Sequence, residues 1–426
     1  MIQLVRESSL PALPADCAAG FSDRVQIKEF FAKAVKEWNG TEFSADLTQL
    51  VEEKGLSYVS DAVEGMLLGT FEPERFPIVA RKEWKMELLG LPIEAENIVR
   101  ETETIMEGVF WARDMTNRPG NLLRPEAFAG EVQKLFAGVP AEVEILDAEK
   151  MKELGLNAVL GIGMSSAYKP CLCIIRYKGN PGDDRVTGLV GKGVTCDTGG
   201  YCLKSSSSMK GIKGDMAGGA AVAGAVYALA KNRIPANVTA LIPMVENRLS
   251  DGSLLPGDVI TSYSGKTIEV MDTDAEGRLI LADAVTYAVR NEHVDRVLDI
   301  ATLTGCICAS LGFGAAGMLC DNEDFVRDFE RAYHKSGERY LRFPIYPEYE
   351  RLIESDIADV KNVGGKFAGS ITAGLFIRRF AEQTPWMHLD IAGTAWVDPP
   401  VFEYQSKGAS GAGLTTMYYL CAGERR

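Results

Sequence analysis

Between residues 127 and 301, short and almost continuously apolar runs alternate with helical segments. Strands that are apolar on both faces are typical of a mostly parallel sheet covered by helices on both sides. The pattern predicts an α/β fold, in which binding sites lie in loops at the carboxyl ends of the strands. The predicted strands are 141–146, 172–177, 186–191, 238–244, 267–270 and 296–301, and the predicted helices are 127–136, 216–231 and 277–290.

A chain of 426 residues is too long for one simple core, so two domains are expected. Residues 93–116 place apolar side chains at helical spacing before an Asn-Arg-Pro-Gly break, which predicts a long connecting helix. We therefore expect a small N-terminal α/β domain over residues 1–92 and a large domain, built on the central sheet, over residues 117–426. In the small domain, the predicted helix is 32–38 and the predicted short strands are 3–5, 66–71 and 76–80.

The charge balance argues against nucleic acid as a main partner. The sequence has 45 Lys and Arg against 59 Asp and Glu, a net charge of -14, which phosphate groups would repel. No apolar run is long enough to cross a bilayer, so no membrane partner is expected. The first residues lack a basic region followed by an apolar core, so we expect no signal peptide and a cytoplasmic location.

Cysteine and histidine give little support for a soft-metal site. The 9 cysteines are an odd number in a long chain, which fits a reducing compartment. Cys171 with Cys173, and Cys306 with Cys308, do not have zinc-site spacing, and we predict buried core thiols. There are only 3 histidines and no HExxH pattern, so a catalytic metal would need mainly oxygen ligands.

Carboxylates gather in loops that follow predicted strands. Asp274 and Glu276 lie two residues apart between the strand at 267–270 and the helix at 277–290. Two carboxylates on one side of extended backbone repel each other unless a cation lies between them, and hard divalent ions meet that need. A helix cap would explain Asp274 but not Glu276 together with Arg278. Taken singly, Asp215 could be a helix cap and Asp197 a turn residue.

Two glycine-rich patterns suggest nucleotide binding but fail on spacing. The segment around Lys192 is too short for GxxxxGK[ST], and Gly193 stands where that motif has Ser or Thr. The GxGxxG of Gly312, Gly314 and Gly317 has no acidic residue about 20 positions further on. A tight, closely packed turn is the better interpretation of that second pattern.

Taken together, the motifs resemble the leucine (cytosol) aminopeptidase family. The run Asp272-Thr-Asp-Ala-Glu-Gly-Arg-Leu279 closely resembles the NTDAEGRL signature of that family. Four further segments match in order over roughly residues 115–426, namely 190–200, 213–220, Ala-Thr-Leu-Thr-Gly at 301–305 and His-Leu-Asp-Ile-Ala-Gly at 388–393. The resemblance implies that residues 117–426 form a metallo-aminopeptidase catalytic domain with two divalent ions, Zn or Mn, with Mg or Co as alternatives.

The resemblance also implies roles for individual residues. Asp197 and Glu276 would bridge the two ions, Lys192 (as a neutral amine) and Asp215 would complete the tighter site, and Asp274 the more exchangeable one. A metal-bridged water would then hydrolyse the N-terminal peptide bond. Lys204 would polarise the carbonyl, and Arg278 would bind a bicarbonate ion that serves as the base. The implied substrate-binding residues are Ile212, Thr302, Leu303, Gly305 and Ala395.

The sequence departs from the family pattern at two positions. Asp272 stands where the family usually has Asn, and Ile212 stands where it often has Met. The extra carboxylate is expected to tighten metal binding or shift metal preference.

The resemblance implies a homohexamer that admits short peptides with a free N-terminus. Some relatives also regulate transcription by binding DNA, which the negative charge argues against here. An inactive scaffold is disfavoured because all implied ligands and both catalytic residues are present.

Overall fold

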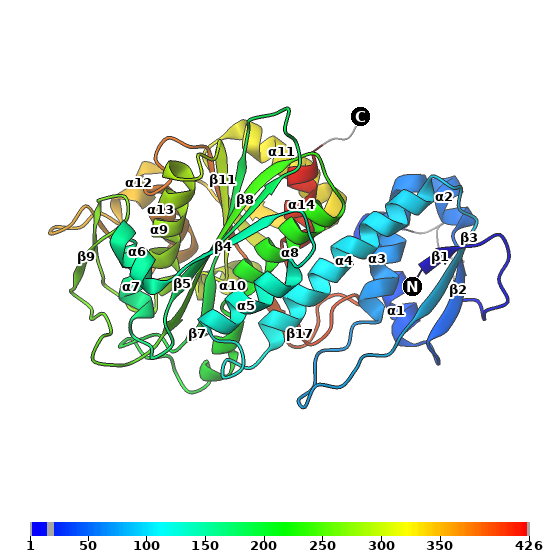
Figure 1. Ribbon diagram of the computed structural model, residues 1–426, viewed down its shortest axis with the longest axis horizontal. Coiled ribbons are helices and arrows are strands. Elements are labelled where there is room, and N and C mark those ends of the chain that lie inside the picture. Colours follow the sequence, from blue (N-terminus) through cyan, green and yellow to red (C-terminus); the bar gives the residue numbers. More distant parts are fainter. Residues whose placement is uncertain (1, 15–20, 424–426) are drawn as a thin grey trace.

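A nine-stranded sheet forms the centre of the protein in the computed structural model, which describes residues 2–14 and 21–423 (Figure 1). Its strand order is β13-β12-β15-β11-β6-β8-β5-β4, and β7 also pairs with β8. The central strands β15, β11, β6 and β8 are parallel, whereas β12, β5 and β4 each run antiparallel to a neighbour. The predicted mostly parallel sheet is confirmed. Its strands are β4 (Glu142–Leu146), β5 (Cys171–Lys178), β6 (Thr187–Gly191), β7 (Gly193–Asp197), β8 (Asn237–Asn247), β11 (Arg296–Ala301), β12 (Ala316–Cys320), β13 (Tyr340–Arg342) and β15 (Trp386–Asp390).

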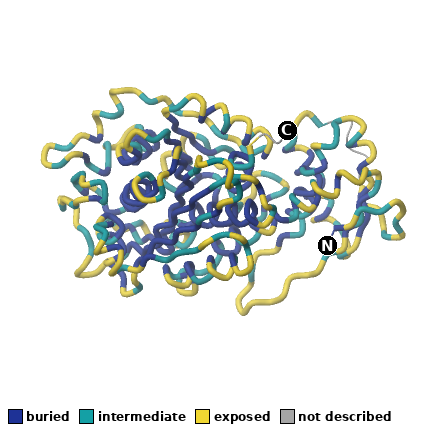
Figure 2. The backbone as a smooth tube through the Cα atoms, turned by 45° about the horizontal axis from the view of Figure 1, so that its top comes forward, coloured by how far each residue is buried: buried dark blue, intermediate teal, exposed yellow. Residues whose placement is uncertain are grey.

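Helices cover both faces of this sheet and create two buried cores (Figures 1 and 2). Successive strand residues point to opposite faces, so Leu189 lies in one core and Val190 in the other. The first core is closed by α4 (Ala95–Asn117), α5 (Pro125–Leu135), α8 (Ala217–Lys231), α11 (Glu323–Ser336) and α14 (Leu414–Ala422). The second core is closed by α6 (Ala148–Leu154), α7 (Asn157–Gly163), α9 (Glu276–Arg290) and α13 (Gly369–Arg378).

Shorter elements connect these layers. A three-stranded sheet, β14-β10-β9, and a two-stranded sheet, β16-β17, lie outside the central sheet. The elements are η3 (Met209–Gly214), β9 (Val259–Thr261), β10 (Thr267–Glu269), α10 (Gly305–Leu311), α12 (Pro347–Arg351), β14 (Val360–Lys361), β16 (Trp396–Val397) and β17 (Gly408–Ala409).

The N-terminal part has its own three-stranded parallel sheet, in the order β1-β3-β2, and its own apolar core. Its elements are β1 (Ile2–Leu4), α1 (Arg24–Lys36), β2 (Glu42–Asp46), α2 (Thr48–Lys54), η2 (Leu56–Tyr58), α3 (Val59–Gly69) and β3 (Lys85–Leu89). The long helix α4 carries Val99 in this core and Ile105 in the core of the large sheet. It therefore contributes to both cores.

Two predicted N-terminal strands are wrong. Residues 66–69 belong to helix α3, where Ala62, Val63 and Met66 face the core at helical spacing. Residues 76–80 lie in a loop before β3, and Ile78 and Val79 are each 66% exposed. An isolated apolar run of this length does not distinguish a strand from a buried helix or a surface loop.

The cysteine prediction holds for one pair only. Cys171 and Cys173 are buried in β5, as expected. Cys306 is exposed and Cys308 is only half-buried, because both lie on the short helix α10 at the surface.

Among the described residues, the helices lack the combination of length and apolar composition that crossing a bilayer requires.

A buried carboxylate of α9 holds the start of α7. Asp283 is fully buried and accepts hydrogen bonds from the backbone N–H groups of Ala158 (2.8 Å), Val159 (3.1 Å) and Tyr263 (2.7 Å). Burial raises the pKa of Asp283 to about 7, although these hydrogen bonds act in the opposite direction. The unfolded chain has an Asp pKa of about 3.9, so the folded protein holds this proton more tightly.

This shift predicts a pH dependence of stability. The contribution of Asp283 is fully present below about pH 4 and is lost as the pH rises through 7. Asn at this position does not titrate. We therefore expect the difference in unfolding free energy between the wild type and Asp283→Asn to shrink by up to roughly 4 kcal/mol over this range. Urea unfolding at a series of pH values measures it, and a difference that stays constant with pH would refute the prediction.

Candidate metal centre

The predicted site is built from the carboxyl ends of β6 and β7, the connection between β7 and α8, and the segment between β10 and α9. Lys192 lies between β6 and β7, and Asp197 is the last residue of β7. Asp215 follows η3 and precedes α8, while Glu276 is the first residue of α9. This is the edge of the sheet where an α/β fold places its binding site.

Asp197, Asp215 and Glu276 form a compact acidic cluster. Each offers a carboxylate oxygen, and these oxygens all lie within 4.8 Å of one another. Glu276 is fully buried, and Asp197 is nearly so. Among the described residues, Asp215 Oδ2 and Glu276 Oε2 are buried without a hydrogen-bond partner, whereas Glu276 Oε1 lies 2.8 Å from the Lys192 ammonium. Such oxygens are costly unless a cation binds them, so the residues present fit a site for hard divalent ions.

Lys192 is the positive charge inside this cluster. Its Nζ donates to Asp215 Oδ1 at 2.7 Å and to the carbonyl oxygen of Thr302 at 3.1 Å, and it lies 2.8 Å from Glu276 Oε1. Burial lowers the pKa of Lys192, but the neighbouring carboxylates more than offset this effect and leave the pKa above its usual value. The neutral amine expected from the sequence therefore requires additional positive charge beside these carboxylates, as divalent cations would supply.

Lys204 and Asp274 border the cluster. The Nζ of Lys204 lies 2.6 Å from Asp197 Oδ2 and also pairs with Asp274. Burial, followed by the negative charge of Asp197, raises the pKa of Asp274 to about 7. Burial also raises the pKa of Glu276, again with Asp197 as the next contribution. Four carboxylates thus share two ammonium groups, and the site carries an excess of negative charge.

Two glycines allow this close approach. A side-chain Cβ at Gly277 would lie 2.4 Å from Lys192 Cε, and one at Gly199 would lie 2.9 Å from Asp274 Oδ1. Gly199 also has a φ of +87°, which favours glycine. The glycines of the two motifs therefore make room for the charged side chains.

Gly277→Ala is expected to displace Lys192 and lower kcat/KM for peptide hydrolysis by about 10²-fold, because small misplacements of catalytic groups are costly. The matched control is Gly130→Ala in helix α5, where an added Cβ meets nothing within 4 Å. That control should keep full activity and gain up to about 1 kcal/mol of stability from helix propensity. Equal activity of the two variants would argue against a functional role for the close approach.

Arg278 lies two residues beyond Glu276 on α9 and is 7% exposed. Its Nη1 donates to the carbonyl oxygen of Asn362 at 2.8 Å, and its Nε has no hydrogen-bond partner among the described residues. Burial lowers the pKa of Arg278. The guanidinium is therefore oriented beside the cluster and keeps one donor for an anion.

Two asparagines that the sequence did not point out hold the site in place. Asn247, at the end of β8, donates from Nδ2 to Asp197 Oδ1 and to the carbonyl oxygen of Thr273, both at 2.9 Å. Asn362, after β14, accepts from the backbone N–H of Met271 and donates to the carbonyl oxygen of Asp272, both at 2.7 Å. Asn247 is the last residue of β8 and Asn362 directly follows β14, and this position at a strand end is the one signal that could have marked them.

Asp272, the departure from the family pattern, acts within its own loop. Its Oδ1 accepts a hydrogen bond from the backbone N–H of Asp274 at 2.8 Å. An asparagine oxygen could accept the same bond, so the replacement preserves the local geometry while adding a negative charge.

The predicted substrate residues lie in two groups. Thr302 contacts the cluster directly, since its Oγ1 donates to Asp215 Oδ1 at 2.7 Å, and Leu303 and Gly305 follow it. Ile212 lies in η3, and Ala395 is buried just before β16. The Lys213 ammonium lies 5.4 Å from the ring centre of Trp396, so these last two segments are neighbours.

Comparison with known proteins identifies the family. The profile of the cytosol aminopeptidase family, catalytic domain, matches residues 110–418. The chain belongs to the cytosol aminopeptidase family. A probable cytosol aminopeptidase from Solibacter usitatus is 43% identical over 373 residues, covering 87% of this chain and 77% of that protein. One from Clostridium tetani is 38% identical over 404 residues, covering 93% of this chain and 84% of that protein.

Solved structures agree with this assignment. The bottromycin maturation enzyme BotP in complex with Mn superposes with a TM-score of 0.88 at 30% identity, covering 95% of this chain and 88% of that one. This cytosol aminopeptidase family member is therefore an enzyme, a hydrolase with the α/β fold of its relatives.

Proposed function

We propose that this aminopeptidase removes the N-terminal residue of short peptides with the help of two divalent cations. In this proposal, Asp197, Asp215, Asp274 and Glu276 would hold the cations, together with Lys192 as a neutral amine. The observation that carries it is that Asp215 Oδ2 and Glu276 Oε2 are buried in the acidic cluster without a hydrogen-bond partner among the described residues.

The proposal assigns a role to each of these residues. Two divalent cations held there would supply an activated water and polarise the scissile carbonyl. Lys204, at the border of the cluster, would donate a hydrogen bond to the oxyanion that develops in the transition state. Arg278 would hold bicarbonate through its remaining donor, and that anion would accept the proton of the water. This arrangement needs no histidine base.

Metal, substrate pocket and assembly are further parts of the proposal. Zn or Mn are the expected metals, with Mg or Co as alternatives, and one structural relative was solved with Mn. Ile212, Thr302, Leu303, Gly305 and Ala395 would line the pocket for the N-terminal side chain. We also propose a homohexamer in the cytoplasm, with residues 1–92 as a separate small domain, 93–116 as the connecting helix and 117–426 as the catalytic domain.

A pair of substrates tests the proposed reaction. With Zn²⁺ or Mn²⁺ present, a dipeptide with a free amine should be hydrolysed, and its N-acetylated form at least about 10²-fold more slowly, since the free amine is to be recognised. A chelator should remove the activity, and readdition of the metal should restore it. Equal rates for the two substrates would contradict aminopeptidase specificity, and full activity after chelation would contradict the metal centre.

A further inference from the structure

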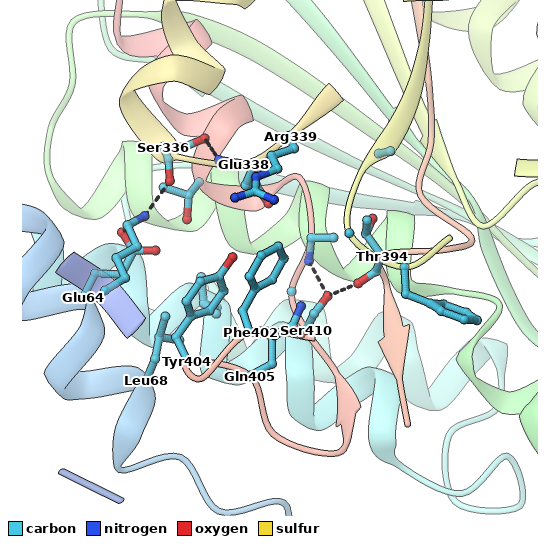
Figure 3. Close-up of a pocket in the computed structure, with 18 of the residues that line it drawn as sticks. Glu64, Leu68, Ser336, Glu338, Arg339, Thr394, Phe402, Tyr404, Gln405 and Ser410 are labelled. Atoms are coloured by element: carbon cyan, nitrogen blue, oxygen red, sulfur yellow. Dashed lines mark hydrogen bonds and ion pairs between the residues drawn. The ribbon is translucent and has the colours of Figure 1, made fainter. Parts of the chain in front are cut away.

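A second cavity, separate from the metal centre, lies between the N-terminal part and the large sheet (Figure 3). Its volume is about 70 Å³, which is room for a molecule of a few non-hydrogen atoms. Glu64 on α3, Arg113 on α4, and Phe402 and Tyr404 of the segment after β16 contribute to its lining. The cavity shares no lining residue with the proposed metal ligands or substrate pocket.

Arg113 is the unusual residue of this cavity. It is only 1% exposed, and its Nε donates to the carbonyl oxygen of Ser410 at 2.8 Å. Its Nη1 is buried and has no hydrogen-bond partner among the described residues, nor does a described carboxylate lie within ion-pair distance. A buried guanidinium without an ion-pair partner is costly, even though the charges of Glu64 and Asp114 favour it from a distance and the ring centre of Phe71 lies 5.0 Å away.

The other charged groups that line the cavity already have partners. Lys28 lies 2.8 Å from Glu64 and donates to the carbonyl oxygen of Ser336. Glu338 accepts hydrogen bonds from the backbone N–H groups of Gly413 and Thr416. Arg339 is exposed and lies over the ring of Phe402. The Arg113 guanidinium is therefore the charge in this lining that calls for an additional anion.

We propose that this cavity binds a small monovalent carboxylate anion whose oxygens accept hydrogen bonds from Arg113. A planar carboxylate matches the geometry of a guanidinium, and one negative charge balances the one buried cation of the lining that has no ion-pair partner. The side chains of Leu68, Val109 and Phe402 provide an apolar wall for a short alkyl group. Burial lowers the pKa of Arg113 to about 10, so the guanidinium is still charged at neutral pH.

Acetate titration of the intact enzyme tests the proposal, with ionic strength held constant by NaCl. We expect calorimetric binding to the wild type, and a dissociation constant at least tenfold higher for Arg113→Met. The matched control is Arg339→Met, which removes an exposed arginine from the same cavity and should keep wild-type affinity. Equal affinity of all three proteins, or no binding to the wild type, would overturn the proposal.

Two further measurements exclude acetate binding at Arg278 and do not depend on the folding of Arg113→Met. Arg278 also has a free donor, so acetate binding must persist in Arg278→Met if the cavity is the site. A crystal of the wild-type enzyme grown with acetate should show the carboxylate against Arg113. Loss of binding in Arg278→Met, or only water beside Arg113 in such a crystal, would contradict the proposed site.

Discussion

Glu276→Ala is expected to reduce kcat/KM for dipeptide hydrolysis by at least about 10³-fold, the largest effect of any single substitution considered. Glu276 is fully buried, and its Oε2 lacks a hydrogen-bond partner among the described residues. Its Oε1 lies 2.8 Å from Lys192 Nζ, and it belongs to the acidic cluster with Asp197 and Asp215, so it would be one of the residues that hold the cations. Its removal should therefore lower the number of bound metal ions as well as the rate.

The control for this prediction is Glu323→Ala. Glu323 is also the first residue of a helix, α11, but it is exposed and pairs with Arg342. Both substitutions remove a carboxylate from the first residue of a helix, but Glu323→Ala should keep full activity. Metal content by mass spectrometry and steady-state kinetics provide the two readouts. Near-normal turnover by Glu276→Ala would exclude the proposed centre as the site of hydrolysis.

Lys204→Met should lower kcat by about 10²–10³-fold, with both metal ions retained. The ammonium of Lys204 pairs with Asp197 and Asp274 at the border of the cluster, where it can reach a developing negative charge. Lys204 is not a proposed metal ligand, so its removal takes no ligand away from the metal ions. It also removes an ammonium group that competes with the metal ions for the carboxylates of Asp197 and Asp274. Metal affinity should therefore be equal to or higher than that of the wild type, while catalysis is lost.

Lys210→Met is the matched control, since Lys210 is exposed in η3 on the same loop and should be replaceable without effect. Metal titration and kcat are measured on both variants. Loss of metal from Lys204→Met would mean that the residue supports the metal centre instead of the transition state. An unchanged kcat would mean that it has neither role.

The parts of the fold that are buried on two faces could be predicted from the sequence. The apolar runs that became β5, β6, β8 and β11 are recognisable because helices cover both sides of each strand. Helix α4 was predictable because apolar positions recur over its full length. The run at 66–71 was predicted wrongly because, taken alone, its consecutive apolar residues fit a strand, whereas the helical spacing of Ala62, Val63 and Met66 begins before that run.

The charged residues of the site could be found from ordered motifs, but the residues that position them could not. Asn247 and Asn362 hydrogen-bond to the backbone of residues 271–273 only because β8 and β14 end beside that segment in the fold. The space around Gly277 likewise depends on where Lys192 lies. The unpaired Arg113 was equally hidden, since its surroundings come from α3, α4 and the segment after β16. Such contacts form between residues that are far apart in the sequence, so no local sequence pattern predicts them.

The central claim is that side chains from separate loops hold two divalent cations at one place. A crystal of the enzyme grown with Mn²⁺ and measured at an anomalous wavelength tests it most directly. We predict two anomalous peaks per chain, roughly 3.5–4 Å apart, enclosed by Lys192, Asp197, Asp215, Asp274 and Glu276. A well-ordered structure with no peak among these residues, or with manganese bound only elsewhere, would contradict the claim.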